Sequence, residues 1–246
     1  MRFFLIFTLC FLTLVAEEKK QSITLGLGSY VQTQPYQNVD TLILPSPVIF
    51  FDNGLLYVRW TRVGLYFLGE KQDSYAWGFS LTAQPRTYGY NSDDIAGMDE
   101  RETSWEGGLA FSASKDDAWI EVMALTDILD RYDSFMIKTE FGYDFKYKEL
   151  SFYPSLIATY QSSKFLNYYY GIKESEIMIG SRNIYRANHG FQLGIQTYIK
   201  YPLTKNLSTL INLKVDKISN EATDSPIVNQ SYIYSGLASL IYTFEF

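Results

Sequence analysis

The one histidine of the 246-residue chain is the natural starting point for any acid–base or nucleophilic chemistry. A Ser–His or Asp–His mechanism would have to be built on this residue, His189. It lies in Ala187-Asn188-His189-Gly190, where a long predicted loop enters a predicted strand. No serine follows at a spacing that puts both side chains on one strand face, and no nucleophile elbow surrounds a serine. The sequence therefore predicts a structural or interfacial histidine, no catalytic residue, and a protein that is not an enzyme.

Metal and cofactor chemistry has equally little support. The acidic pairs Asp93-Asp94 and Asp99-Glu100, together with Asp224, could hold a weakly bound calcium ion on loops, since calcium prefers oxygen ligands. Charged loops are usually only solvated, however, and one histidine adds little to such a set. We predict no metal site and no cofactor.

The N-terminus has the pattern of an export signal. Arg2 precedes an almost unbroken apolar run over residues 3–15, which is too short for a membrane-spanning helix. The run ends at the small residue Ala16, and we predict cleavage after it. Cys10 lies inside this signal, so the mature chain has no cysteine for disulfide or thiolate chemistry. We predict a signal peptide over residues 1–16 and one domain over residues 17–246.

The composition limits the class of the exported domain. Aromatic residues make up 17% of the chain, with 21 tyrosines and 17 phenylalanines, and the mean hydropathy is only -0.10. No long apolar segment follows the signal. A secreted β-sandwich and an outer-membrane barrel both fit these properties, but only the barrel turns an apolar sheet face toward lipid.

Long stretches of alternating residues favour the barrel. In residues 190–201, apolar or aromatic side chains alternate with polar ones, and residues 135–147 and 207–215 repeat the pattern. Successive strand residues point to opposite faces, so each stretch has one apolar wall, and each is about long enough to cross a membrane as a tilted strand. The last segment, 236–246, alternates in the same way and ends on an aromatic residue. We interpret Tyr242, Phe244 and Phe246 as the signal read by the barrel-assembly machinery.

The strands can be counted from these stretches. Short turns and long connections alternate along the chain, which predicts periplasmic turns, outer loops and periplasmic termini. The two-residue connection Thr61-Arg62 interrupts that alternation, so ten strands stay possible. Pro45 and Pro47 fall inside the second strand, which must then be bulged or shorter, because proline cannot donate to a ladder. We predict an all-β transmembrane antiparallel barrel of about twelve strands, at 22–33, 41–51, 54–60, 62–69, 74–86, 104–114, 117–126, 134–147, 149–161, 190–201, 206–217 and 231–246.

The charges do not identify a ligand. Without the signal, 20 basic residues face 27 acidic ones, a net charge of -7, which disfavours nucleic acid as a partner. Inward-facing positions mix both signs, with Lys138 beside Glu140 and Lys214 beside Asp216. A barrel of this size lies between filled small barrels and open porins. We expect a plugged or narrow lumen.

Four short motifs resemble those of the MipA/OmpV family of outer-membrane proteins, in order and spacing from about residue 24 onward. They are Gly97-Met98-Asp99-Glu100-Arg101, Asn167-Tyr168-Tyr169-Tyr170-Gly171-Ile172, Ser225-Pro226-Ile227 and Tyr242-Thr243-Phe244. The family's Pro-x-Tyr-x-Gly element is matched only loosely by Pro35-Tyr36-Gln37, because Asn38 follows where the family has a glycine.

The resemblance implies a non-enzymatic scaffold, with no catalytic residues. The family's founding member is described as joining a murein lytic transglycosylase to a bifunctional penicillin-binding synthase, whereas other members are described as porins or adhesins. It implies as partners outer-membrane lipid and lipopolysaccharide, the barrel-assembly machinery and these murein enzymes, in the cell outer membrane. A narrow channel for small solutes is the alternative. The motif residues either serve the barrel itself or take part in binding. In the first case the tyrosines and Arg101 would pack and pair inside the mouth, and Gly97 and Gly171 would permit tight loop turns.

Overall fold

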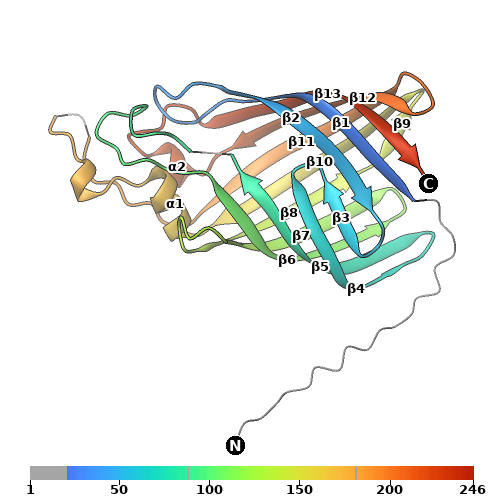
Figure 1. Cartoon of the computed structure of the whole chain (residues 1–246). Coiled ribbons are helices and arrows are strands. Elements are labelled where there is room, and N and C mark those ends of the chain that lie inside the picture. Colours follow the sequence, from blue (N-terminus) through green and yellow to red (C-terminus); the bar gives the residue numbers. More distant parts are fainter. Residues whose placement is uncertain (1–20, 88, 181) are drawn as a thin grey trace, which may run out of the picture.

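The computed structural model describes residues 21–246, apart from residues 88 and 181 (Figure 1). The predicted signal, including Cys10 and the cleavage site after Ala16, lies outside the described residues. Within the described part, no helix is long and apolar enough to cross a membrane.

Strands make up most of the chain, and the connections add two short helices and one 3-10 turn. The helical elements are α1 (Ser163–Tyr170), η1 (Glu174–Glu176) and α2 (Asn220–Thr223). The strands are β1 (Ser22–Gln32), β2 (Leu42–Asp52), β3 (Leu56–Arg59), β4 (Arg62–Lys71), β5 (Tyr75–Arg86), β6 (Ser104–Lys115), β7 (Ala118–Asp127), β8 (Phe135–Tyr143), β9 (Phe145–Tyr147), β10 (Leu150–Gln161), β11 (Gly190–Pro202), β12 (Leu207–Lys217) and β13 (Tyr232–Glu245).

The strands close into a twelve-stranded antiparallel barrel. Each strand pairs with its neighbours in sequence, β13 pairs with β1, and β10 pairs with both β8 and β11. β8 and β9 form one barrel strand that is interrupted at Asp144, since both pair with β10. The predicted count of twelve is confirmed, and the ten-strand alternative is wrong because Trp60-Thr61 is a genuine tight turn between β3 and β4.

The outer wall is apolar because of the alternation seen in the sequence. Along β11, Phe191, Leu193 and Ile195 are exposed on the outside, whereas Gln192 is buried inside. Aromatic side chains such as Tyr232 and Tyr242 lie near the two ends of the strands and are exposed. This arrangement of an apolar band between aromatic girdles is typical of an outer-membrane barrel.

The two ends of the barrel differ. Short turns follow β2, β4, β6, β9 and β11, at the same end as residue 21 and the C-terminus (Figure 1). The connections 33–41, 87–103, 128–134, 162–189 and 218–231 lie at the other end. Short turns are periplasmic and long loops extracellular in such barrels, and these two ends are called the periplasmic end and the outer end.

The prediction about the prolines in β2 was wrong. β2 is neither bulged nor shortened, because it pairs with β1 in continuous register from Leu42 to Phe51. On its other side it pairs with β3 only from Phe50 to Asp52. Pro45 and Pro47 therefore lie where β2 is a free edge, the position in a sheet that tolerates proline.

Candidate functional site

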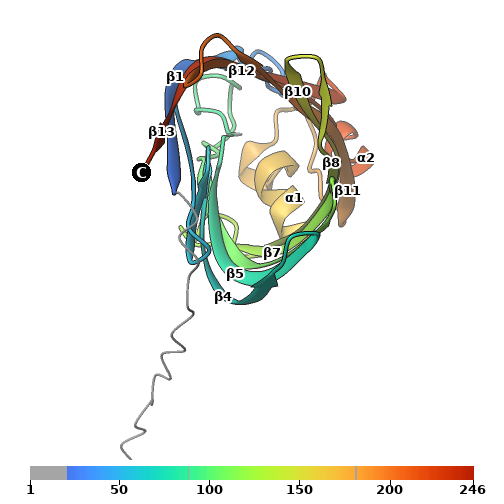
Figure 2. The ribbon, with the colours of Figure 1, turned by 90° about the vertical axis from the view of Figure 1, so that its right-hand side faces the viewer.

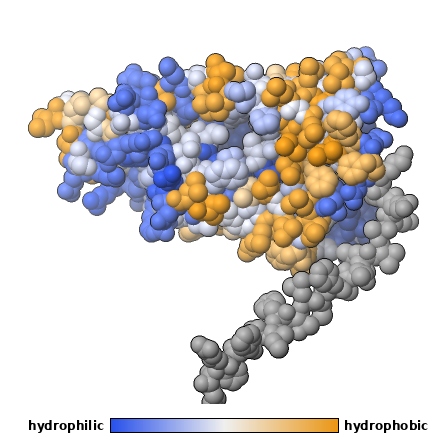
Figure 3. Space-filling view, in the orientation of Figure 1, coloured by the Kyte–Doolittle hydropathy of each residue, from blue (hydrophilic) through white to orange (hydrophobic). Residues whose placement is uncertain are grey.

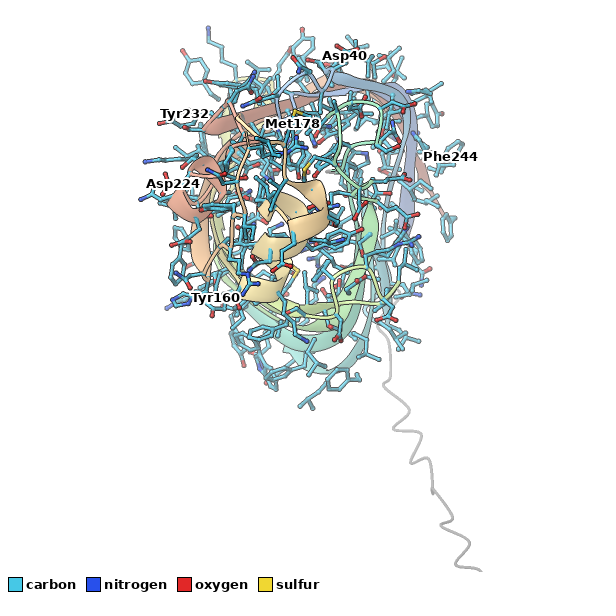
Figure 4. The ribbon with its side chains drawn as sticks, turned by 90° about the vertical axis from the view of Figure 1, so that its left-hand side faces the viewer. Asp40, Tyr160, Met178, Asp224, Tyr232 and Phe244 are labelled. Carbon is cyan, nitrogen blue, oxygen red and sulfur yellow. The ribbon has the colours of Figure 1, made fainter. Side chains whose placement is uncertain are left out.

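The helix α1 lies inside the outer half of the lumen (Figures 2 and 4). Ser162 caps its start by accepting a hydrogen bond from the Phe165 N–H at 3.3 Å. At its end, the Gly171 N–H donates to the Asn167 carbonyl at 3.0 Å, and a Cβ on Gly171 would lie only 2.4 Å from that oxygen. Gly171 is thus needed because its backbone lies close to the Asn167 carbonyl, and not because of a positive φ. Gly97, in contrast, has a φ of +75°, as a tight loop turn requires.

Aromatic residues from three other outer connections meet those of α1 in a buried cluster, here called the tyrosine plug. Its members are Tyr36, Tyr90, Tyr132, Phe165, Tyr169 and Tyr170, all buried. The Tyr36 ring lies 4.7 Å from that of Tyr90 and 5.6 Å from that of Tyr170, and Tyr132 lies 5.0 Å from Phe165. The plug therefore lies inside the outer half of the lumen, in agreement with the plugged or narrow lumen that the sequence predicted.

Burial changes the acidity of the phenols in the plug. Loss of hydration raises the pKa of Tyr36 well above its ordinary value, and burial raises the pKa of Tyr170 in the same way. Both phenols therefore stay neutral at any physiological pH.

Arg86, at the end of β5, joins the wall to the plug. Its guanidinium lies 4.3 Å from the ring centres of both Phe165 and Tyr169, and it pairs with the buried Glu106 at 3.6 Å. Such cation–π contacts gain strength when water is excluded.

A buried ion pair fixes the loops around the plug. The Arg101 guanidinium donates to Glu176 Oε1 at 2.6 Å, and the two side chains are only 2% and 1% exposed. Arg101 also donates to the carbonyls of Tyr168 and Asp99, at 2.5 and 2.8 Å. Glu176 in turn accepts the backbone N–H groups of Asp99 and Lys173, at 3.1 and 2.8 Å. The Arg101–Glu176 pair thereby joins the connection 87–103 to the connection 162–189.

The other family-motif positions converge on the same region. The Asn167 side chain donates to the Ala187 carbonyl at 2.6 Å and accepts from its N–H at 3.0 Å. The Ser225 hydroxyl donates to the Tyr170 carbonyl at 2.6 Å, and the Pro226 carbonyl accepts from the Gln37 amide at 2.8 Å. With the buried Met98, these residues hold the outer loops onto the plug.

The candidate catalytic and metal residues are not brought together. His189 is exposed, and its ring lies 5.7 Å from that of Tyr160. Among the described residues, no group of three or more His, Cys, Asp and Glu side chains could hold a metal ion. The three assembly-signal residues, Tyr242, Phe244 and Phe246, are exposed on the outer wall near the periplasmic end, and their role stays a prediction.

Below the plug, the lumen contains paired charges. Lys138 lies 3.6 Å from Glu140 and Lys214 lies 2.8 Å from Asp216, as the alternation predicted. Glu121 pairs with both Arg59 and Arg62. The middle of the lumen is therefore polar but close to electrically balanced.

One recess at the periplasmic mouth is different, because its charges are unbalanced. A recess of about 640 Å³ is lined by Lys146, Lys148, Lys200 and Lys205, with Glu149 as the one acidic residue. Within the described part of the chain, none of these lysines forms an ion pair with a carboxylate. This group of side chains, here called the lysine recess, is suited to an anionic partner.

Comparison with known proteins places the chain in a family. The family described as MltA-interacting protein MipA matches residues 25–244. The chain belongs to this family. It is 23% identical to the putative outer membrane protein YiaT of Escherichia coli strain K12, over 95% of each chain. It is also 23% identical to the MltA-interacting protein of the same strain, over 91% of this chain and 90% of that one.

A further MipA-family relative is the outer membrane protein OmpV of Vibrio cholerae, 24% identical over 72% of this chain and 69% of that one. Among solved structures, an outer membrane channel from Pseudomonas putida F1 superimposes with a TM-score of 0.46 and 11% identity, over 93% of this chain and 97% of that one. The family match and the outer membrane proteins among the relatives confirm the predicted family and the outer-membrane location.

Proposed function

We propose that this MipA-family barrel is a non-enzymatic, non-conducting scaffold that binds a murein lytic transglycosylase at its periplasmic end. The observation that carries the proposal is the tyrosine plug. Tyr169, Tyr170 and Phe165 are fully buried in the outer half of the lumen, and the Arg101–Glu176 pair holds the surrounding loops. A channel for solutes needs a continuous aqueous path, and the tyrosine plug lies across the outer half of the lumen, where that path would run.

The lysine recess supports the choice of the periplasmic end. Its four lysines lack acidic partners in a chain whose overall charge is negative, and complementary charge chiefly provides specificity and fast association. An acidic surface of a periplasmic enzyme would supply the missing carboxylates. A relative that covers nearly the same length is named for its interaction with MltA, which agrees with such a partner. A penicillin-binding synthase is the second partner that the scaffold would join.

The test is a crosslinking pull-down of the tagged protein from intact cells, with mass spectrometry of the recovered partners. The Lys148→Glu/Lys205→Glu variant reverses two charges at the lysine recess and should lower recovery of the transglycosylase at least tenfold. The matched control, Lys164→Glu/Lys173→Glu, makes the same charge change at the outer end, where both lysines are exposed. Equal losses in both variants, or no transglycosylase with the native protein, would contradict the proposal.

A narrow channel is the second candidate, supported by the row of paired charges between the plug and the recess. Single-channel recording in planar bilayers tests it directly. Stable conductance of the native protein that changes when Lys138 or Glu140 is reversed in charge would favour the channel over the scaffold. A bilayer that shows no conductance with the native protein would exclude the channel.

A further inference from the structure

The barrel wall has a gap on the side of β2. The β3–β4 hairpin turns at Trp60-Thr61, so β4 pairs with β5 only as far as Ala83. Residues 43–48 of β2 and residues 84–86 of β5 have no strand on the sides that face each other. Thr87 bounds the gap at the outer end by donating to Gln32 of β1 at 2.9 Å. We call this gap the wall window; Figure 1 shows far strands through it, and Figure 3 shows a pale, hollowed band there between two hydrophobic areas.

Prolines occupy both edges of the wall window. The Trp60 N–H donates to the Ile49 carbonyl at 2.8 Å, so the odd-numbered residues of β2 turn their backbone groups toward the window. Pro45 and Pro47 therefore lack an N–H where it would point into the gap. On β6, the Trp105 carbonyl accepts from the Ile128 N–H, so the backbone groups of Trp105 point away from β5. Pro85 is paired with Trp105 in register, and its own backbone groups therefore point away from β6, toward the window. No N–H donor is left unpaired at these three positions, and no further strand can add there.

One edge carbonyl is also satisfied locally. Trp60 Nε1 donates to Ser46 Oγ at 2.9 Å, and Ser46 Oγ lies 3.4 Å from the Pro47 carbonyl, to which it donates. An unpaired backbone group costs several kcal/mol, in order of magnitude, where no water is available. The missing N–H groups at Pro45, Pro47 and Pro85 and the bonded Pro47 carbonyl thus reduce the number of backbone groups that these edges would expose to hydrocarbon.

The position of the wall window along the barrel axis also indicates that its edges meet hydrocarbon. The outward side chains beside it are apolar and exposed, including Ile43 (68%), Val63 and Leu81. Ile43 pairs with Val31, which is opposite Gly236, and the exposed Tyr234 lies further toward the outer end on the same strand. The window therefore lies on the membrane side of the outer tyrosines and faces the acyl chains of the outer leaflet.

The inward side of the β5 edge is polar, since Gln84 and Arg86 both bond to Glu106, but the lumen behind the β2 edge is apolar. Val48, Leu210, Leu237 and Ile241 form a buried cluster there. Trp60 packs against it and lies edge-on to Tyr30 at 5.6 Å and to Tyr198 at 6.4 Å. A hydrocarbon chain that enters along the β2 edge would meet these aromatic and aliphatic side chains.

We propose that the wall window is a lipid-binding site, in which an acyl chain of an outer-membrane lipid passes between β2 and β5 and lies against Trp60. The proposal is independent of the scaffold function, because it uses neither the lysine recess nor the plug. It makes the lumen accessible from the membrane, through the side of the barrel.

The experiment uses the full mature protein in vesicles that contain a phosphatidylcholine with a diazirine in its acyl chain. Illumination makes the diazirine react with nearby groups, and mass spectrometry locates the adducts. Ser46 and Ser239 form a matched pair, since both are inward-facing and 8% exposed. Ser46 borders the window, whereas Ser239 lies on β13 with paired strands on both sides.

We expect adducts on Ser46 and Trp60 at least tenfold more often than on Ser239, with the outward Ile43 as the positive control. Adducts on Ile43 alone, or equal yields on Ser46 and Ser239, would overturn the proposal. In a second variant, Leu44→Trp, the larger side chain should block the window. Adducts on Trp60 should then fall to the Ser239 level, and an unchanged yield in the folded variant would also overturn it.

Discussion

Removing the charge of Glu176 should release the outer loops without opening the barrel. Each carboxylate oxygen of Glu176 accepts a backbone N–H, from Asp99 and from Lys173. In Glu176→Gln, the amide NH₂ must face one of these donors whichever way it is turned, and the buried Arg101 loses its counter-charge. Removing one partner of a buried ion pair costs about 3–5 kcal/mol. The strand ladder, closed all round, should stay intact.

Hydrogen exchange of single amides measures this cost locally. The N–H groups of Gly171 and Ile172, bonded to the Asn167 and Tyr185 carbonyls, report opening of the plug. Since about 1.4 kcal/mol corresponds to a factor of ten, their exchange should accelerate roughly a hundred- to a few-thousand-fold.

The matched control is Glu174→Gln, on the same 3-10 turn but exposed, which should change exchange little. Equal exchange in the Glu176 and Glu174 variants would refute the reasoning. The Arg101→Met/Glu176→Gln double variant should lose less than the sum of the single variants, because no unpaired charge remains buried.

Three further predictions concern other regions. Raising the pH well above 10 should open the plug. Burial raises the pKa of Tyr36 and Tyr170, so the buried phenols stay neutral only up to those pKa values, and ionising them favours the open plug. A late step in tyrosinate absorbance that coincides with proteolytic cleavage of the 162–189 loop would support this, and titration without cleavage would contradict it. Gly64→Ala should destabilise the barrel by about 1–3 kcal/mol, since a Cβ there would lie 2.2 Å from the Tyr57 ring; denaturant midpoints should show little further loss in a Tyr57→Ala background. Phe246→Ala should lower the outer-membrane amount several-fold in cells but not refolding in detergent, whereas Phe246→Tyr should leave both unchanged.

The barrel itself could be predicted from the sequence, because the alternation of inward and outward side chains is visible within each strand. Strict alternation marks β11, β12 and the barrel strand formed by β8 and β9 together, and the predicted bounds differ from the structure by about two residues or fewer. The inward charges Lys138 and Glu140 follow from the same alternation. Even the tight turn after β3, which argued for ten strands, belongs to a genuine pair of barrel strands.

The plug and the wall window could not be predicted in the same way. Glu176 and Arg86 reach their partners only when long loops fold back into the lumen, and no periodicity records such a contact. The motif resemblance pointed to Arg101 but not to Glu176. For the window, the signal was present in Pro45 and Pro47, which indicated a free edge on β2 but were interpreted as a bulge or an early end of the strand.

The pairing of β1 with β13 has a kinetic consequence. The hydroxyl oxygens of Thr24 and Thr243 lie 2.9 Å apart where β1 and β13 pair, although the two residues are 219 positions apart in the sequence. Contacts of such high sequence separation form slowly, because the entropy of closing the loop is lost before the contact is gained. The ring cannot close until the last strand has been synthesised and exported. Until then both edges of the growing sheet are unpaired and prone to aggregation, so the chain depends on being held and guided in the periplasm before insertion.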